Sequence, residues 1–192
     1  MPRKPSFDRD VLIDQARDLF WKQGWAGTSM KDLEKALKLK PGSFYAAFGS
    51  KGALFELALD RYAAAGAARL SALADEVGAF GALKHYPALL MDMTAAPARA
   101  CMLSKTVLEL KTQEAALAAK AEEHLQRMEA LFEALFRRAQ QNGDIGTGHD
   151  PTALARRYQS DLLGLRVSAE RLGVDTDALA QDIAAGLDRL AD

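Results

Sequence analysis

The stretch PGSFYAAFGSKGALF, residues 41–55, contains one short helix and the start of a longer one. Pro41 suits the first turn of a helix, because the N–H that proline lacks would be unpaired there. Phe44 and Phe48 are four residues apart and share one helix face, so the pattern predicts that both point inward. The glycine and serine that follow end this helix and cap the next one. The stretch therefore predicts a short helix with one buried and one exposed face.

Two further short helices are expected before this stretch. Asp8 or Asp10 is positioned to cap the first, which ends at Gly24, and Thr28 is expected to cap the second, which ends near Lys38. Apolar residues recur at intervals of three and four in both. Three short helices in this order, the second and third forming a helix-turn-helix, are the unit that places a recognition helix in the major groove of DNA.

The rest of the chain also has the pattern of helices. Alanine and leucine are abundant, β-branched residues are few, and nothing alternates with the period of a strand. Breaks rich in Gly, Pro or polar residues separate the expected helices, which cover residues 51–76, 82–94, 99–112, 114–141, 152–172 and 175–190. The sequence thus predicts an all-α fold of about nine helices. Residues 1–52 form the helix-turn-helix domain, and residues 53–192 form a larger helical domain for ligand binding and dimerisation.

The residues around the third helix match a known family. The run from Tyr45 to Phe55 resembles the tetracycline-repressor (TetR) family of transcriptional regulators, together with upstream Ala16, Phe20, Gly24, Thr28, Ser29 and Leu33. Further along, Cys101-Met102-Leu103 leading to Glu109-Leu110 looks like a segment of one branch of that family. The resemblance implies a repressor that binds a palindromic operator in double-stranded DNA and leaves it when a small effector binds.

The resemblance also implies which residues contact DNA. Thr28 and Lys51 match positions that reach phosphates, and helix N-termini suit that role because they present free N–H groups and a partial positive charge. Ser29, next to Thr28, and Lys40, just before the third helix, complete the predicted contacts. The residues expected to face the groove are Gly42, Ser43, Tyr45, Ala46 and Ala47.

Two positions depart from the family pattern. Lys38 stands where the family has a glycine in the helix-turn-helix turn, and Lys40 stands where it has a serine cap. A non-glycine residue in a left-handed turn costs about 1 kcal/mol, and a lost cap costs about the same. Both lysines add positive charge. Residues 1–51 contain ten Lys/Arg and six Asp/Glu, whereas the remaining residues contain fifteen and twenty, so the basic end is the candidate polyanion-binding end.

The larger domain is expected to supply the dimer interface and the effector site. A two-fold dimer matches a palindromic operator, and two apolar stripes on the last helices provide a surface for it: Leu154, Leu162 and Leu165, and then Leu179, Ile183, Leu187 and Leu190. Flexible sulfur and aromatic side chains suit a small apolar effector of unknown identity. The predicted ligand-binding residues are Tyr86, Met91, Cys101, Met102, Glu109, Phe132, Phe136 and Tyr158. Binding is expected to shift the long fourth helix and change the separation of the two DNA-binding heads.

Other classes of function find little support in the sequence. The single cysteine, Cys101, rules out an intramolecular disulfide framework, although its oxidation or alkylation is a rival trigger for release. The three histidines lack metal-ligand spacing, and no catalytic constellation or cofactor motif is present, so we expect no enzyme, metal or cofactor. Without an apolar leader or span, a cytoplasmic protein without membrane contact is expected. The alternatives are a helical ligand-binding or signalling module without DNA binding, and an enzyme on an all-α scaffold.

Overall fold

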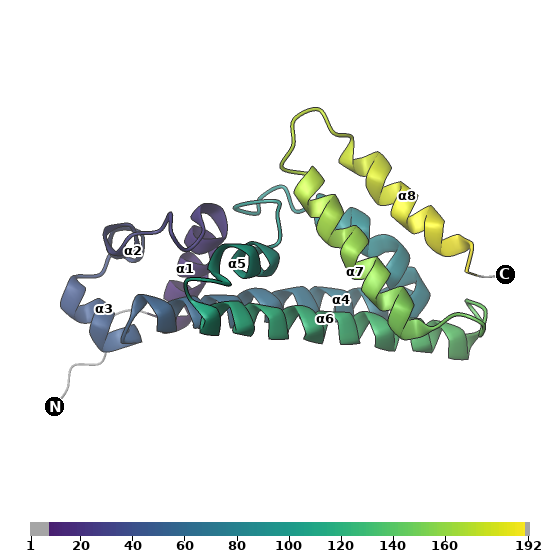
Figure 1. Cartoon of the computed structure of the whole chain (residues 1–192), viewed down its shortest axis with the longest axis horizontal. Coiled ribbons are helices and arrows are strands. Elements are labelled where there is room, and N and C mark those ends of the chain that lie inside the picture. The colour runs from purple at the N-terminus through teal and green to yellow at the C-terminus, as the bar shows by residue number, and fades with distance from the viewer. Residues whose placement is uncertain (1–7, 191–192) are drawn as a thin grey trace. The chain divides into compact units, whose positions relative to one another are not determined.

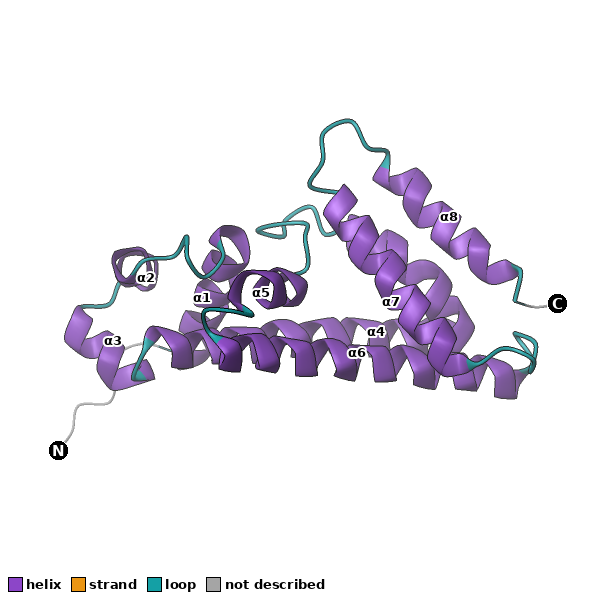
Figure 2. Ribbon diagram, in the orientation of Figure 1, coloured by secondary structure: helices purple, strands orange, loops and turns teal. Residues whose placement is uncertain are grey.

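The computed structural model describes residues 8–190, and every regular element in that part of the chain is a helix (Figures 1 and 2). The predicted all-α fold is confirmed. Arg3 and Lys4, which contribute to the predicted basic end, lie outside the described residues. None of the described helices is long and apolar enough to cross a membrane. The helices are α1 (Arg9–Gln23), α2 (Met30–Leu37), α3 (Pro41–Phe48), α4 (Lys51–Met91), α5 (Met102–Leu110), α6 (Ala115–Asn142), α7 (Pro151–Ser168) and α8 (Thr176–Asp188).

Several helix boundaries differ from the sequence prediction; α7, for example, ends at Ser168 rather than at Leu172. The expected break at residues 78–81 is confined to Gly78, whose φ of 78° and ψ of 173° are not helical, so α4 is two helices joined at one residue. The helix expected from Arg99 begins only at Met102. The backbone N–H groups of Arg99 and Ala100 instead donate to the Glu170 carboxylate, both over 2.7 Å. A side chain distant in sequence therefore binds the segment that precedes this helix.

The chain packs as two compact units, which we describe separately. Unit 1 comprises Met1–Ala64 and Met102–Glu122, and unit 2 comprises Ala65–Cys101 and Glu123–Asp192. This division does not follow the predicted boundary between residues 52 and 53. It assigns α5 and the first turns of α6 to the same unit as α1, α2 and α3. The chain crosses between the units within α4, before α5 and within α6.

Unit 1 has an aromatic core beneath its three short helices. Phe20 of α1 packs edge to face against Phe55 of α4, with ring centroids 4.7 Å apart, and Trp25 approaches the same ring at 5.1 Å. Edge-to-face aromatic pairs add about 0.5–1.5 kcal/mol beyond their buried area. At the surface, Arg61 of α4 pairs with Asp10 of α1 over 2.6 Å. These contacts fix α1 against the start of α4.

Unit 2 contains a hydrogen bond that compensates for a proline inside α4. Pro87 has no N–H to donate to the carbonyl of Leu83, four residues earlier. The hydroxyl of Tyr158 on α7 donates to that carbonyl over 2.6 Å. Tyr158 is 2% exposed, and burial raises the pKa of its hydroxyl. The hydroxyl is therefore a protonated donor that satisfies a backbone acceptor freed by the proline.

This pairing predicts how the Tyr158 hydroxyl contributes to stability. Tyr158→Phe should lower the free energy of unfolding by about 1–2 kcal/mol, because it leaves a buried carbonyl without a partner. In a Pro87→Ala background the cost should be smaller, since the alanine restores a backbone N–H that can reach the carbonyl of Leu83. Urea unfolding at a fixed protein concentration measures both values. Tyr86→Phe is the matched control, because none of the described hydrogen bonds uses its hydroxyl. Equal costs of Tyr158→Phe in both backgrounds would contradict this explanation.

Candidate nucleic-acid interface

Helix α3 presents one face to solvent and buries the other, as the sequence predicts. Phe44 is 0% exposed and Phe48 is 5% exposed, and both pack into unit 1. Tyr45 is 53% exposed, the highest value among the large side chains of this helix. Of the other residues expected to face the groove, Gly42, Ser43 and Ala46 are exposed and Ala47 is half-buried.

The exposed face of α3 has the chemistry of a DNA-reading surface. Ser43 and Tyr45 present hydroxyls that can donate to or accept from phosphates and base edges. Ala46 is a small apolar side chain that suits contact with a thymine methyl group. At the N-terminus of the helix, Lys40 makes no side-chain cap hydrogen bond. Its ammonium and the free backbone N–H groups behind it are available to a phosphate.

The turn before α3 contains the strained residue that the sequence predicts. Lys38 has φ 52° and ψ 38°, and it is the one non-glycine residue with positive φ in the described part of the chain. The left-handed region costs a residue with a Cβ about 1–2 kcal/mol. The chain tolerates this strain because Leu33 and Leu37, which precede the turn, are almost completely buried.

The cap of α2 lies one residue later than predicted. Ser29, not Thr28, caps the helix, and its hydroxyl accepts from the N–H of Asp32 over 3.2 Å. The Asp32 carboxylate accepts in turn from the backbone N–H of Ser29 over 2.9 Å, and hydrogen bonding by Ser29 lowers the pKa of Asp32. Thr28 is 1% exposed and donates its hydroxyl to the carbonyl of Gly24 over 2.7 Å. Its side chain therefore stabilises the α1–α2 turn and is not exposed for the phosphate contact predicted for it, whereas Ser29, also a predicted DNA contact, is exposed.

Lys51, the other predicted phosphate contact, lies at the first position of α4 and reaches the same turn. Its Nζ donates to the carbonyl of Trp25 over 2.7 Å and lies 4.0 Å from the centroid of the Trp25 ring. The pKa of Lys51 is lowered, chiefly by burial, while the carboxylates of Glu109 and Glu114 oppose that shift. The ammonium is thus bound to the protein in this structure, and its contact with phosphate remains a prediction.

The predicted ligand-binding residues are divided between the two units. Met102 and Glu109 belong to unit 1, whereas the other six belong to unit 2. Both carboxylate oxygens of Glu109 accept backbone N–H groups, from Trp25 over 3.1 Å and from Ala26 over 2.7 Å. Sequence reasoning missed this contact, because partners 84 residues apart share no periodic pattern. In unit 2, the predicted residues that belong to the hydrophobic core are Tyr86, Met91, Phe132, Phe136 and Tyr158.

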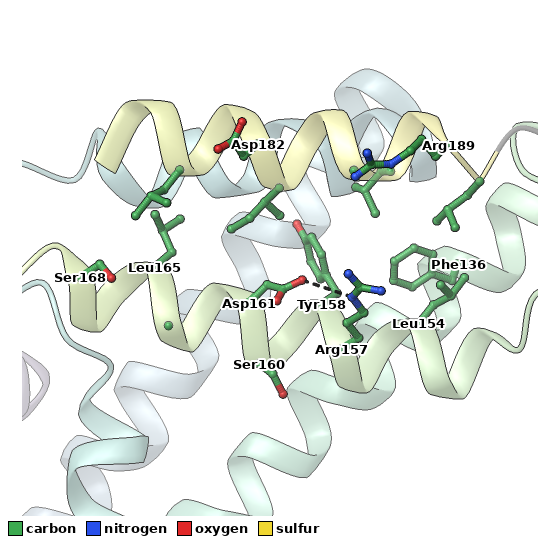
Figure 3. A pocket seen from close by; sticks show the side chains of 16 residues that line it. Phe136, Leu154, Arg157, Tyr158, Ser160, Asp161, Leu165, Ser168, Asp182 and Arg189 are labelled. Atoms are coloured by element: carbon green, nitrogen blue, oxygen red, sulfur yellow. Dashed lines mark ion pairs between the residues drawn. The ribbon is translucent and has the colours of Figure 1, made fainter. Parts of the chain in front are cut away.

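Six of the seven predicted dimer residues line a groove between α7 and α8. Its volume is about 610 Å³, and in Figure 3 the labelled Leu165, Tyr158 and Phe136 lie between the two helices. Leu162 is 4% exposed and does not line the groove, and its place in a dimer interface stays a prediction. The predicted dimer residues that line the groove are Leu154, Leu165, Leu179, Ile183, Leu187 and Leu190.

A three-helix head with an exposed third helix defines a helix-turn-helix DNA-binding protein, and comparison with known proteins agrees. Residues 12–58 match the family described as "Bacterial regulatory proteins, tetR family", and residues 66–185 match the "Tetracyclin repressor-like, C-terminal domain". The chain is 31% identical over 185 residues to the HTH-type transcriptional repressor ComR of Escherichia coli K12, covering 93% of this chain and 87% of ComR.

Solved structures show the same fold. A TetR-family regulator from Cytophaga hutchinsonii superposes with a TM-score of 0.83 at 23% identity, covering 95% of this chain and 92% of that one. The TetR-family regulator CifR, solved as a cysteine mutant complexed with 26-bp double-strand operator DNA, superposes with a TM-score of 0.79 at 28% identity, covering 97% and 98%. The chain belongs to the TetR family and is a DNA-binding transcriptional regulator.

The exposed position of Tyr45 predicts a binding defect without a folding defect. Tyr45→Ala should weaken binding to a selected duplex by about 1 kcal/mol, because it removes a polar contact and bulk from the reading face. The free energy of unfolding should stay within about 0.5 kcal/mol of wild type, as is usual for an exposed side chain. Fluorescence anisotropy and urea unfolding measure the two quantities, with Gln181→Ala on α8 as the control. Unchanged affinity would mean that α3 does not present this face to DNA.

Proposed function

We propose that this chain is a repressor that binds a palindromic operator as a homodimer and leaves it when a small effector binds. The observation that supports this most strongly is the exposed face of α3, from Gly42 to Ala46, over a buried Phe44 and Phe48. A helix in the major groove needs such a face, and a protein that only binds ligands does not. The proposed DNA contacts are Ser29, Lys40, Gly42, Ser43, Tyr45, Ala46, Ala47 and Lys51.

Positive charge next to α3 favours contact with the DNA backbone. Lys31 and Lys35 are exposed on α2, and Lys38 and Lys40 are exposed in the turn that leads to α3. Lysines that neutralise phosphates release counterions, so affinity should fall steeply as salt rises. Lys40→Ala should then reduce the slope of log affinity against log salt by about 1. A helical signalling module without DNA binding predicts no salt-sensitive binding at all.

The groove between α7 and α8 supports dimerisation through the last two helices. Leu154, Leu179, Ile183 and Leu190 are not fully buried within the chain, although all four face the same groove. A Cβ placed on Gly164 would meet nothing within 4 Å, so another helix can approach closely there. A second copy that packs its own α7 and α8 against these residues would bury them and place two heads on one duplex.

A charge in this groove should separate the two subunits. Ile183→Glu places an unpaired carboxylate among apolar side chains, which is strongly unfavourable in a buried interface. The variant should sediment as a folded monomer and bind a duplex with two half-sites at least tenfold more weakly, because a monomer contacts one half-site only. Gln181→Glu is the control, since it adds the same charge at an exposed position of α8 outside the groove. An Ile183→Glu protein that remains a dimer would place the interface elsewhere.

The effector is proposed to be a small apolar molecule that binds in unit 2. The aromatic and methionine side chains of its core, including Met91 and Phe132, can rearrange around an apolar ligand. Binding would shift α4, which begins at the DNA-binding head, and so change the separation of the two heads. A ligand that prefers the DNA-incompetent state by about 10²-fold contributes roughly 2.7 kcal/mol, enough to empty an operator bound with modest excess.

Modification of Cys101 is the rival trigger, and burial argues against it. Cys101 is 6% exposed, and a buried cysteine reacts slowly with oxidants and electrophiles. We therefore expect peroxide or N-ethylmaleimide to leave wild-type protein and Cys101→Ser equally bound to DNA, as measured by anisotropy under non-denaturing conditions. Release of the wild type alone would identify the thiol as the switch and would contradict an apolar effector as the main signal.

A further inference from the structure

The carboxylate of Glu109 binds the turn that connects α1 to α2. It accepts hydrogen bonds from the consecutive backbone N–H groups of Trp25 and Ala26, over 3.1 and 2.7 Å. Glu109 lies near the end of α5, and it meets the turn within unit 1. Two adjacent N–H groups that point at one anion form a small backbone concavity, and hydrogen bonds to a charged acceptor are about twice as strong as neutral ones. The turn is therefore held by a strong contact from a helix 84 residues away.

The backbone of the turn is shaped to admit this carboxylate. Gly24 ends α1 with φ +76°, and a Cβ placed on it would lie 2.9 Å from Oε2 of Glu109. Any other residue at this position would meet both the unfavourable positive φ and the carboxylate. The close approach of Glu109 thus depends on the glycine, and the two residues form one structural feature.

The same turn fixes the starts of two helices that are proposed to contact phosphate. Thr28, next to the cap of α2, donates its hydroxyl to the carbonyl of Gly24 over 2.7 Å. Lys51, the first residue of α4, donates to the carbonyl of Trp25 over 2.7 Å. Trp25 is therefore bound through its N–H by Glu109 and through its carbonyl by Lys51. A shift of this residue would displace both helix N-termini.

A second polar side chain of α5 strengthens the attachment to α1. Lys105 donates its ammonium to the carbonyl of Trp21, over 2.8 Å, in the last turn of α1. Carbonyls at the end of a helix lack intrahelical donors, and a cation there interacts favourably with the helix dipole. Helix α5 thus places a cation on the C-terminal end of α1 and an anion on the N–H groups that follow it.

We propose that Glu109 is a positioning residue for DNA binding, which acts through the α1–α2 turn without touching DNA. This inference rests on the proposed function, because it concerns the affinity of the head for its operator. A simple charge argument predicts the opposite effect: removal of an anion from the DNA-binding unit should strengthen binding to a polyanion. The two explanations therefore differ in the sign of the effect.

The experiment compares Glu109→Gln with Glu114→Gln in the full chain. Glutamine keeps the size of the side chain but loses the charge and one of the two acceptor oxygens. Glu114 is an exposed carboxylate that also affects the pKa of Lys51, and none of the described hydrogen bonds uses its side chain. The DNA probe is a duplex that the wild-type chain selects from a randomised pool. Anisotropy gives the affinity, and hydrogen exchange of the free protein gives the protection of the amides of Trp25 and Ala26.

We expect Glu109→Gln to bind the duplex about tenfold more weakly and to exchange these two amides faster, while its sedimentation and midpoint of thermal unfolding stay close to wild type. Glu114→Gln should bind as well as wild type or better. Unchanged or stronger binding by Glu109→Gln, or unchanged protection of the two amides, would overturn the inference. Salt-sensitive binding by the wild type would still support the proposed function in that case. Absence of salt-sensitive binding by the wild type would overturn both.

Discussion

The α1–α2 turn is the constraint on which the DNA-binding head depends. Its residue Trp25 is held through the N–H by a carboxylate, through the carbonyl by an ammonium, and through the ring by an aromatic core. These contacts come from three helices: Glu109 from α5, Lys51 and Phe55 from α4, and Phe20 from α1. Because α2 starts shortly after the turn and leads directly to α3, the orientation of the recognition helix follows from how this turn is held. The head is therefore assembled from segments that the sequence separates widely.

The C-terminal helices, by contrast, leave apolar side chains that are only partly buried within the chain. Within unit 2 a tyrosine hydroxyl satisfies the carbonyl that Pro87 leaves free, and the side chains of the surrounding core are buried. Between α7 and α8, by contrast, a groove of about 610 Å³ remains, and the leucines and Ile183 that line it include several that are only partly buried. Buried apolar surface is worth roughly 25 cal/mol per Å², so a second copy that covers these side chains would gain stability. The hydrogen-bonded core of unit 2 favours a stable subunit, and the partly buried side chains between α7 and α8 favour the proposed dimer.

Sequence reasoning predicted what depends on local pattern. The periodicity of Phe44 and Phe48 predicted the buried face of α3. The resemblance to the TetR family, which has a glycine at the position of Lys38, implied a strained turn there, and the φ of 52° confirms it. It missed contacts between residues that lie far apart in the sequence. The helix expected from Arg99 starts at Met102, after a segment whose N–H groups bind Glu170, and nothing near Glu109 in the sequence indicates its contact with the α1–α2 turn. The pair of glycines at positions 24 and 27 was the available signal, since closely spaced glycines mark a turn that another group approaches.

The central claim is that two copies of this chain present α3 to the two halves of a palindromic site. Sequencing the duplexes that the purified full chain selects from a randomised pool tests it most directly. The account predicts enrichment of an inverted repeat whose half-sites are separated by about one helical turn or a multiple of it, as a two-fold dimer requires. Enrichment of a single, non-repeated half-site would contradict the dimeric arrangement, and the absence of any enriched sequence would contradict sequence-specific DNA binding.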